Sequence, residues 1–218
     1  MRALHYVGGI VCHQLPDRTL GCAGSAMALC ARCTGIYTGI LLVLIFLAGH
    51  QQLGTRRLPS GMSCALALLA LAGSGIDILL ANNLHCYPSM SWLRVLTGLW
   101  SGIGLTVLCL PLFNSQLLRP RSDEPSSPFS LRTLLLLLFL ALPLTGLLLR
   151  LADCSAGIVA VSAITIAMMA GALVYIFAVI SHALLTCVRA EPSPRSALLI
   201  GCILFAVTTV LIHFLRAT

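Results

Sequence analysis

Long stretches without a charged residue are the feature that most constrains this chain. Each is long enough, or nearly so, to form a transmembrane helix of about 20 residues. The stretches are continuously apolar and do not alternate with polar residues, which excludes a closed strand barrel. Six of them follow one another, at residues 34–55, 58–76, 95–118, 133–149, 154–188 and 196–215.

The composition agrees with a membrane protein. Hydrophobic residues make up 59% of the chain and charged residues only 9%, whereas soluble domains contain about 45–50% and about 25%. So few polar side chains cannot cover a water-soluble core of this size. We therefore expect an all-α, polytopic integral membrane helix bundle of about six transmembrane helices, with no nucleic-acid partner.

The charged and proline-rich segments divide the chain into four parts. We expect a Cys/His-rich segment at the membrane face (1–33), a three-helix front half (34–118), a Pro/Ser-rich linker (119–130) and a three-helix back half (131–218). Residues Thr19–Ala31 are uncharged but too short to span a bilayer. They are interpreted as an interfacial extension of the first helix.

Six helices place both chain ends on one side of the membrane. The loops on the other side, such as the one with Arg56 and Arg57, are shorter and denser in arginine. Short basic loops favour the cytoplasm. This predicts a multi-pass protein of the cell (inner) membrane, with the N-terminal face outward.

Two helix starts have similar sequences. Residues 34–40 read TGIYTGI and residues 97–103 read TGLWSGI. Pairs of small residues four apart allow two helix backbones to approach closely. We expect the first and third helices to pack through Gly35, Gly39, Gly98 and Gly102.

The N-terminal segment contains a pattern of metal-ligating residues. Cys12-His13 is followed by Cys30-Ala-Arg-Cys33, which gives C-H-x16-C-x2-C. The second pair lies within one helical turn, close enough for a disulfide or a shared ion. A set of three cysteines and one histidine suits zinc or another soft metal ion, although adjacent residues seldom bind one ion together. His13 is therefore a fourth ligand, a residue that hydrogen-bonds to one of the metal ligands, or a proton carrier.

Asp77 is the only acidic residue inside an apolar stretch. An ionised carboxylate at membrane depth needs a partner, and Arg94 at the start of the third helix is the expected one. A role in proton transfer is the alternative, so Asp77 and His13 are the candidate catalytic residues. Arg18, Arg32 and Arg94 share the same membrane face and are candidates to bind an anion or a lipid head group.

Two segments, CHQLPDRTL at 12–20 and CARCTGIYTG at 30–39, together resemble the signature of an uncharacterised prokaryotic family of predicted membrane proteins. In that family C-H-Q-x-P-x-R-S precedes C-x-R-C-T-G, and an Asp-bearing helix precedes R-x-x-T-G. The later positions match Asp77, Arg94, Thr97 and Gly98. Thr19 replaces the family's Ser, and Ile78 replaces the Gly that usually follows the Asp. The resemblance covers roughly residues 1–113 and implies a membrane protein without implying an activity.

Three functional hypotheses remain open from the sequence. The first is a metal site of Cys12, His13, Cys30 and Cys33 beside the Arg/Asp cluster. The second is a thiol-disulfide oxidoreductase in which Cys30 and Cys33 pass electrons to a quinone. The third is a non-catalytic subunit or assembly factor that associates with other membrane subunits. Whether the chain is an enzyme is left open.

Overall fold

The structure is a computed structural model that describes residues 2–22, 25–84, 86–88, 90–117, 127–187, 196, 198–204 and 206–207. Most of the linker expected at 119–130 lies outside these residues, as does half of the helix expected at 196–215. The described part is an all-α polytopic membrane bundle with one small hairpin. Five of its helices are long and apolar enough to cross a membrane.

The five long helices follow the charge-free stretches. They are α2 (Ala31–Gly49), α3 (Gly61–Asp77), α4 (Ser91–Leu117), α5 (Leu131–Ala152) and α6 (Ser155–Cys187). Serine caps begin two of them: Ser60 accepts a hydrogen bond from the N–H of Ser63, and Ser130 from that of Thr133. Such caps satisfy N–H groups that a helix start leaves without partners. A π-helical turn, η2 (Ile78–Asn83), continues α3.

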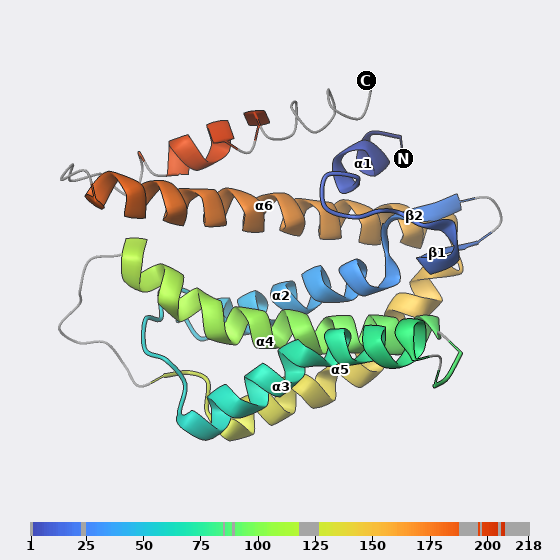
Figure 1. The fold of residues 1–218 in the computed structure, drawn as a ribbon, viewed down its shortest axis with the longest axis horizontal. Coiled ribbons are helices and arrows are strands. Elements are labelled where there is room, and N and C mark those ends of the chain that lie inside the picture. Colours follow the sequence, from blue (N-terminus) through green and yellow to red (C-terminus); the bar gives the residue numbers. More distant parts are fainter. Residues whose placement is uncertain are drawn as a thin grey trace.

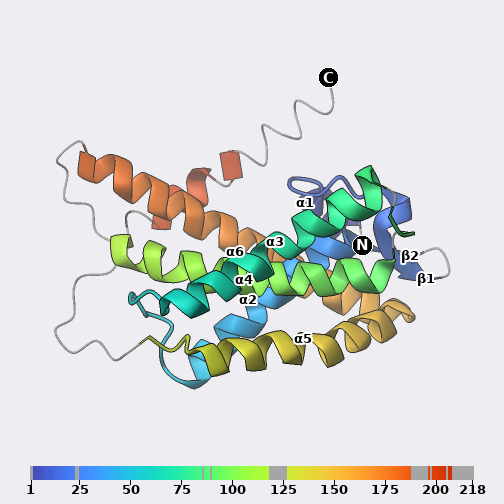
Figure 2. The same cartoon turned by 60° about the horizontal axis from the view of Figure 1, so that its bottom comes forward.

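Helix α4 is the centre of the bundle and contacts α2, α3, α5 and α6. It lies between α6 and α5 in both views of the fold (Figures 1 and 2). The start of α2 and the α5–α6 connection lie at the end of the bundle that carries the hairpin (Figure 1). The residues of that end therefore come from elements far apart in the sequence.

The segment before α2 is a hairpin, and the expected interfacial helix over Thr19–Ala31 is wrong. Strands β1 (Thr19–Cys22) and β2 (Ser25–Cys30) pair antiparallel, with Thr19 opposite Cys30 and a bulge before Gly21. A Cβ on Gly21 would lie 2.4 Å from the Ser25 carbonyl oxygen, so the tight turn requires glycine. Contacts with α6 and α1 stabilise the strand conformation. The length and charge of the segment, from which the helix was expected, contain no information about these contacts.

The hairpin is anchored to the bundle and is not a free loop. Met27, Ala28 and Leu29 are fully buried, and the Ala28 N–H donates to Ser162 Oγ of α6 at 3.1 Å. The short helix α1 (Arg2–Gly8) packs on β2 and α6. Only a glycine fits at Gly8, because a Cβ there would lie 2.5 Å from the Ala28 carbonyl oxygen. This framework holds the residues that follow α1 over the start of α2.

Candidate metal centre

Two local structures place the three cysteines of the motif. Cys30 is the N-cap of α2, with an extended backbone, and Cys33 lies in the first turn of that helix. The cap position and the third helical residue lie on the same side of a helix start. Cys12 comes from the turn after α1, where its N–H donates to the Gly8 carbonyl oxygen at 3.0 Å.

Gln14 holds the turn that carries Cys12. Its backbone has a positive φ of 52°, which is uncommon for a residue other than glycine. Its side-chain Nε2 donates to the carbonyl oxygens of His5 and Ala28, both at 2.7 Å. One amide therefore ties α1, the turn and β2 together and offsets the cost of the unusual backbone conformation.

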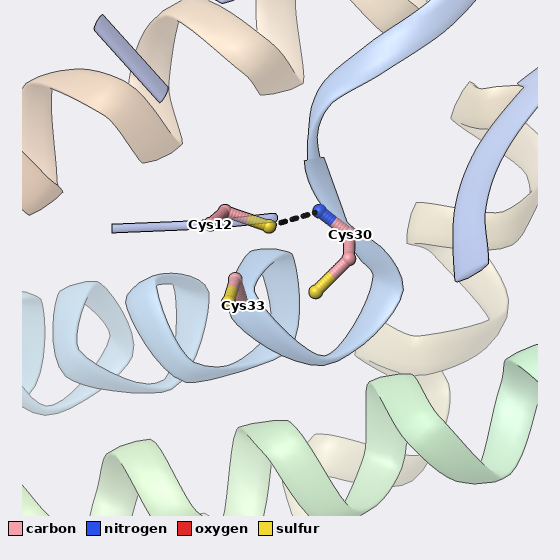
Figure 3. A group of neighbouring side chains, drawn as sticks. All are labelled: Cys12, Cys30 and Cys33. Atoms are coloured by element: carbon pink, nitrogen blue, oxygen red, sulfur yellow. Dashed lines mark hydrogen bonds between the residues drawn. The ribbon is translucent and has the colours of Figure 1, made fainter. Parts of the chain in front are cut away.

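The three sulfur atoms converge on one point. The Sγ atoms of Cys12, Cys30 and Cys33 all lie within 4.8 Å of one another (Figure 3). Zinc bonds of about 2.3 Å in a tetrahedron separate two sulfurs by about 3.8 Å. A small inward movement of the side chains would therefore bring all three to bonding distance of one ion. This group of three cysteines is close enough to bind a metal ion.

Hydrogen bonds in the cluster favour a thiolate at Cys12. The Cys30 thiol is the main cause of a lowered Cys12 pKa, with help from the Cys33 thiol and from the backbone N–H groups of Cys30 and Gln14. The Cys30 N–H reaches Cys12 Sγ at 3.2 Å. Cys30 shows the opposite effect: its pKa is raised, chiefly because its proton is shared with Cys12. The two pKa shifts thus favour a thiolate at Cys12 beside a protonated Cys30.

A cavity of about 290 Å³ opens beside the cluster and is lined by all three cysteines. His13, Arg18 and Arg32 also line it. His13 is exposed, and its ring nitrogens do not belong to the group of ligand atoms within 4.8 Å of one another, which consists of the three cysteine sulfurs. The structure thus brings together the three thiols and two of the expected arginines, while His13 stays at the edge of the cavity.

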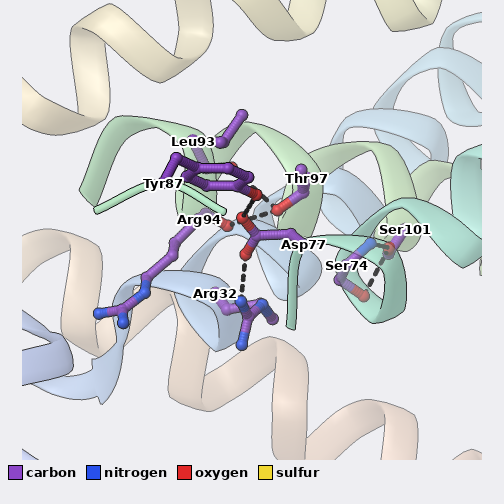
Figure 4. Close-up of polar contacts among 8 residues, drawn as sticks. All are labelled: Arg32, Ser74, Asp77, Tyr87, Leu93, Arg94, Thr97 and Ser101. Atoms are coloured by element: carbon purple, nitrogen blue, oxygen red, sulfur yellow. Dashed lines mark hydrogen bonds and ion pairs between the residues drawn. The ribbon is translucent and has the colours of Figure 1, made fainter. Parts of the chain in front are cut away.

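The buried carboxylate of Asp77 pairs with Arg32, and not with Arg94 as expected. Arg32 Nη2 donates to Asp77 Oδ2, and the Tyr87 hydroxyl donates to Oδ1 at 2.7 Å. This hydrogen bond raises the pKa of Tyr87. The guanidinium of Arg94 points away from Asp77 (Figure 4), and this buried residue does not line the cavity. Because Arg32 lies between Cys30 and Cys33, the Asp77 pair is joined directly to the cysteine cluster.

The start of α2 is held against α4 by the four glycines of the repeated segments. A Cβ on Gly35 would lie 2.4 Å from the Val95 carbonyl oxygen, and one on Gly98 would lie 2.4 Å from that of Arg32. One turn further, a Cβ on Gly39 would meet the Leu99 oxygen at 2.4 Å, and one on Gly102 that of Ile36 at 2.1 Å. Backbone therefore packs on backbone directly below the cysteine cluster.

Sequence reasoning missed two residues of this site. Gln14 lies in the segment CHQLPDRTL, but the spacing of the cysteines and the histidine assigns it no structural role. The signal that could have identified it is its position directly after Cys12-His13. Tyr87 lies in the connection between α3 and α4, and nothing in the sequence links it to Asp77. The hydrogen bonds of both residues depend on how the helices and the hairpin are placed.

Comparisons with known proteins agree with these observations. A family model described as a predicted membrane protein, DUF2085, matches residues 12–108. An uncharacterised protein of Methanocaldococcus jannaschii is 34% identical over 110 residues, which cover 50% of this chain and 68% of that protein. Another, of Methanothermobacter thermautotrophicus, is 35% identical over 102 residues, which cover 45% of this chain and 83% of that protein. No solved structure matches the chain.

The resemblance inferred from the two cysteine segments is confirmed at the level of the family. The matched residues include the three clustered cysteines, the Arg32–Asp77 pair and the α2–α4 contact. Because the Methanocaldococcus and Methanothermobacter relatives exceed 30% identity over more than two thirds of their own lengths, the chain belongs to the DUF2085 family of predicted membrane proteins.

Proposed function

We propose that this membrane protein binds a soft metal ion, zinc in the first instance, through the thiolates of Cys12, Cys30 and Cys33. The observation that carries the proposal is the convergence of the three Sγ atoms within 4.8 Å from two separate segments of the chain. Thiolates are the preferred ligands of zinc and of other soft ions such as Cu(I). Hydrogen bonds that lower the Cys12 pKa prepare one of the three ligands before metal binds.

The metal content of the purified chain tests the proposal. We expect about one zinc per chain in detergent-purified protein, and its loss in Cys12→Ser, Cys30→Ser and Cys33→Ser, because each removes one of the three clustered thiolate ligands. Cys154→Ser is the matched control, because Cys154 is exposed and its bond to the Leu151 carbonyl oxygen can be kept by a hydroxyl. Metal-free wild-type protein after purification with added zinc would refute the proposal.

The same centre predicts a pH dependence. The hydrogen bond with Cys12 raises the pKa of Cys30, so the Cys30 proton must leave when a metal binds. Zinc affinity should therefore fall as the pH falls, by about tenfold per pH unit for each proton released. Competition with a chelator at several pH values measures this slope. A zinc affinity that does not change between pH 8 and pH 6 would contradict thiolate ligation.

A thiol-disulfide oxidoreductase is the second candidate, favoured by the lowered pKa of Cys12 beside the thiols of Cys30 and Cys33. Formation of a Cys30–Cys33 disulfide releases two electrons and two protons, which a membrane quinone would accept. The metal assay separates the two functions. Metal-free protein that loses two reactive thiols on incubation with a quinone would support the redox function and contradict the metal site.

We further propose that the cysteine cluster lies at the outer face of the cell membrane, opposite the cytoplasm. The shorter loops at the other end of the bundle hold Arg56 and Arg57, and such loops favour the cytoplasm. Cys154 is exposed at the end of the bundle that carries the cysteine cluster. A membrane-impermeant maleimide should label it in intact cells. Labelling that requires opened cells would reverse the orientation.

A further inference from the structure

We infer that the metal centre takes a small oxyanion, a phosphate or a carboxylate, as an external ligand bound between the metal and Arg18 and Arg32. This inference rests on the proposed metal site and extends it. The first step is the number of ligands. The described protein groups supply three sulfur atoms, whereas a closed structural zinc site has four protein ligands. A site with three protein ligands keeps a position for water or substrate.

The space beside the centre shows where that ligand would enter. All three cysteines line one cavity of about 290 Å³, so an ion bound among them faces it directly. The volume admits a small anion or the head group of a lipid, and not a whole lipid. Val11 and Leu15 line the same cavity and are exposed, which places apolar surface next to its polar wall.

The charge of the lining selects an anion. Arg18 and Arg32 are the cationic side chains among the described residues that line the cavity, and no carboxylate is among them. Guanidinium groups bind the oxygen atoms of carboxylates and phosphates through two parallel N–H bonds. The exposed imidazole of His13 adds a further polar group at the edge.

Asp77 and Tyr87 fix the orientation of Arg32. Asp77 accepts a bond from Nη2 of Arg32 with one oxygen and a bond from the Tyr87 hydroxyl with the other. The Arg32 side chain is 15% exposed, and its buried Nε has no hydrogen-bond partner among the described residues. One side of the guanidinium is therefore held by the carboxylate, while the residue also borders the cavity. A bound oxyanion would exchange for the metal-bound water, without any transfer of electrons.

Cobalt(II) is a suitable probe, because its visible absorption bands change with its coordination and it occupies the same thiolate sites as zinc. The full chain, in a maltoside detergent and loaded with one equivalent of cobalt, is titrated with inorganic phosphate and with chloride at equal ionic strength. We expect a saturable spectral change with phosphate and none with chloride. Arg18→Gln should raise the phosphate dissociation constant about tenfold, because it removes a charge-assisted hydrogen bond. Arg57→Gln, an exposed arginine outside the cavity, should leave it unchanged.

A second arm distinguishes the source of the anion. Short-chain phosphatidylglycerol replaces free phosphate in the same titration. A tighter response to the lipid assigns a head group, and an equal or weaker response assigns a free anion. A cobalt-loaded protein whose spectrum responds to neither, or whose response is the same in Arg18→Gln and Arg57→Gln, would overturn the inference alone. Failure of the wild-type chain to bind cobalt or zinc would refute the metal site itself, and the inference with it.

Discussion

The central helix α4 and the back helices α5 and α6 are all strongly apolar, but they pack differently. The most apolar segments of α5 and α6 have a mean hydropathy of 2.4, and only 28% of their residues are buried. The corresponding segment of α4 has a lower mean hydropathy of 1.8, but 67% of its residues are buried. Lipid tails are as apolar as leucine, so hydrophobicity does not drive helices together inside a bilayer. Close association depends on small residues, and α4 presents Gly98 and Gly102 to α2.

The spaces around the helices show the same difference. Glycines of the α2–α4 contact have backbone atoms of the facing helix where a side chain would begin, whereas Gly146 of α5 and Gly171 of α6 have no atoms within 4 Å of that position. Gly171 lines a mainly apolar cavity of about 470 Å³ between α6 and the α2–α4 pair. The geometry of the cysteine cluster is therefore supported by a close backbone contact between α2 and α4. Matched substitutions in the two regions test this difference.

The largest effect is expected at the buried ion pair. Asp77→Ala leaves Arg32 without its carboxylate and should lower the free energy of unfolding by about 3–5 kcal/mol. Asp153→Ala, at the exposed end of α5, should change it by less than about 0.5 kcal/mol. Denaturant unfolding in detergent, followed by tryptophan fluorescence, measures both. Equal stabilities of the two variants would show that the pair is not a structural element.

The glycine contact gives the next largest effect. Gly102→Leu places a side chain against the Ile36 backbone and should cost about 3 kcal/mol of stability. Gly171→Leu points into open space and should be neutral or slightly stabilising, because leucine favours the helix more than glycine does. Melting temperatures in detergent compare the two variants. If they fall by the same amount, the front and back halves are equally tight.

Gln14 tests how far the front region depends on one side chain. Gln14→Met keeps the size of the residue but removes both bonds to the carbonyl oxygens of His5 and Ala28, at a cost of about 1–2 kcal/mol. The loss should be local, so hydrogen exchange should speed up in α1 and the Cys12 turn and stay unchanged in α5. Uniform exchange changes across the chain would argue against a local role.

Ser162 is the point where the back half supports the site, and it has the smallest expected effect. Ser162→Ala removes the acceptor of the buried Ala28 N–H and should cost about 1 kcal/mol. Thr165→Val is the control. The Thr165 hydroxyl donates to the carbonyl oxygens of Val161 and Ser162 in its own helix, so its removal should cost less stability. Urea midpoints compare them. A larger loss in Thr165→Val would mean that α6 does not anchor the hairpin through this bond.

Expectations based on local patterns agree best with the structure. The helices α2 to α6 occupy five of the six charge-free stretches, because a run of about 20 apolar residues specifies a span without knowledge of its neighbours. The hairpin at 19–30 was missed because its strands are stabilised by α1 and by Ser162, which is 134 residues from Ala28 along the chain. The periodicity of hydrophobic residues within a short segment cannot predict a contact between residues so far apart in the sequence.

Composition and short spacings are enough to predict the membrane class, the positions of these spans, the family and the closeness of Cys30 to Cys33. Tertiary packing brings Cys12 to these two cysteines and leaves His13 at the edge of the cavity. It also decided that Asp77 meets Arg32 and not Arg94. Both arginines lie near the same membrane face, and the rotation of each helix about its axis determines which guanidinium reaches the carboxylate. Packing sets that rotation, through glycine contacts between helices that the chain separates by about 60 residues.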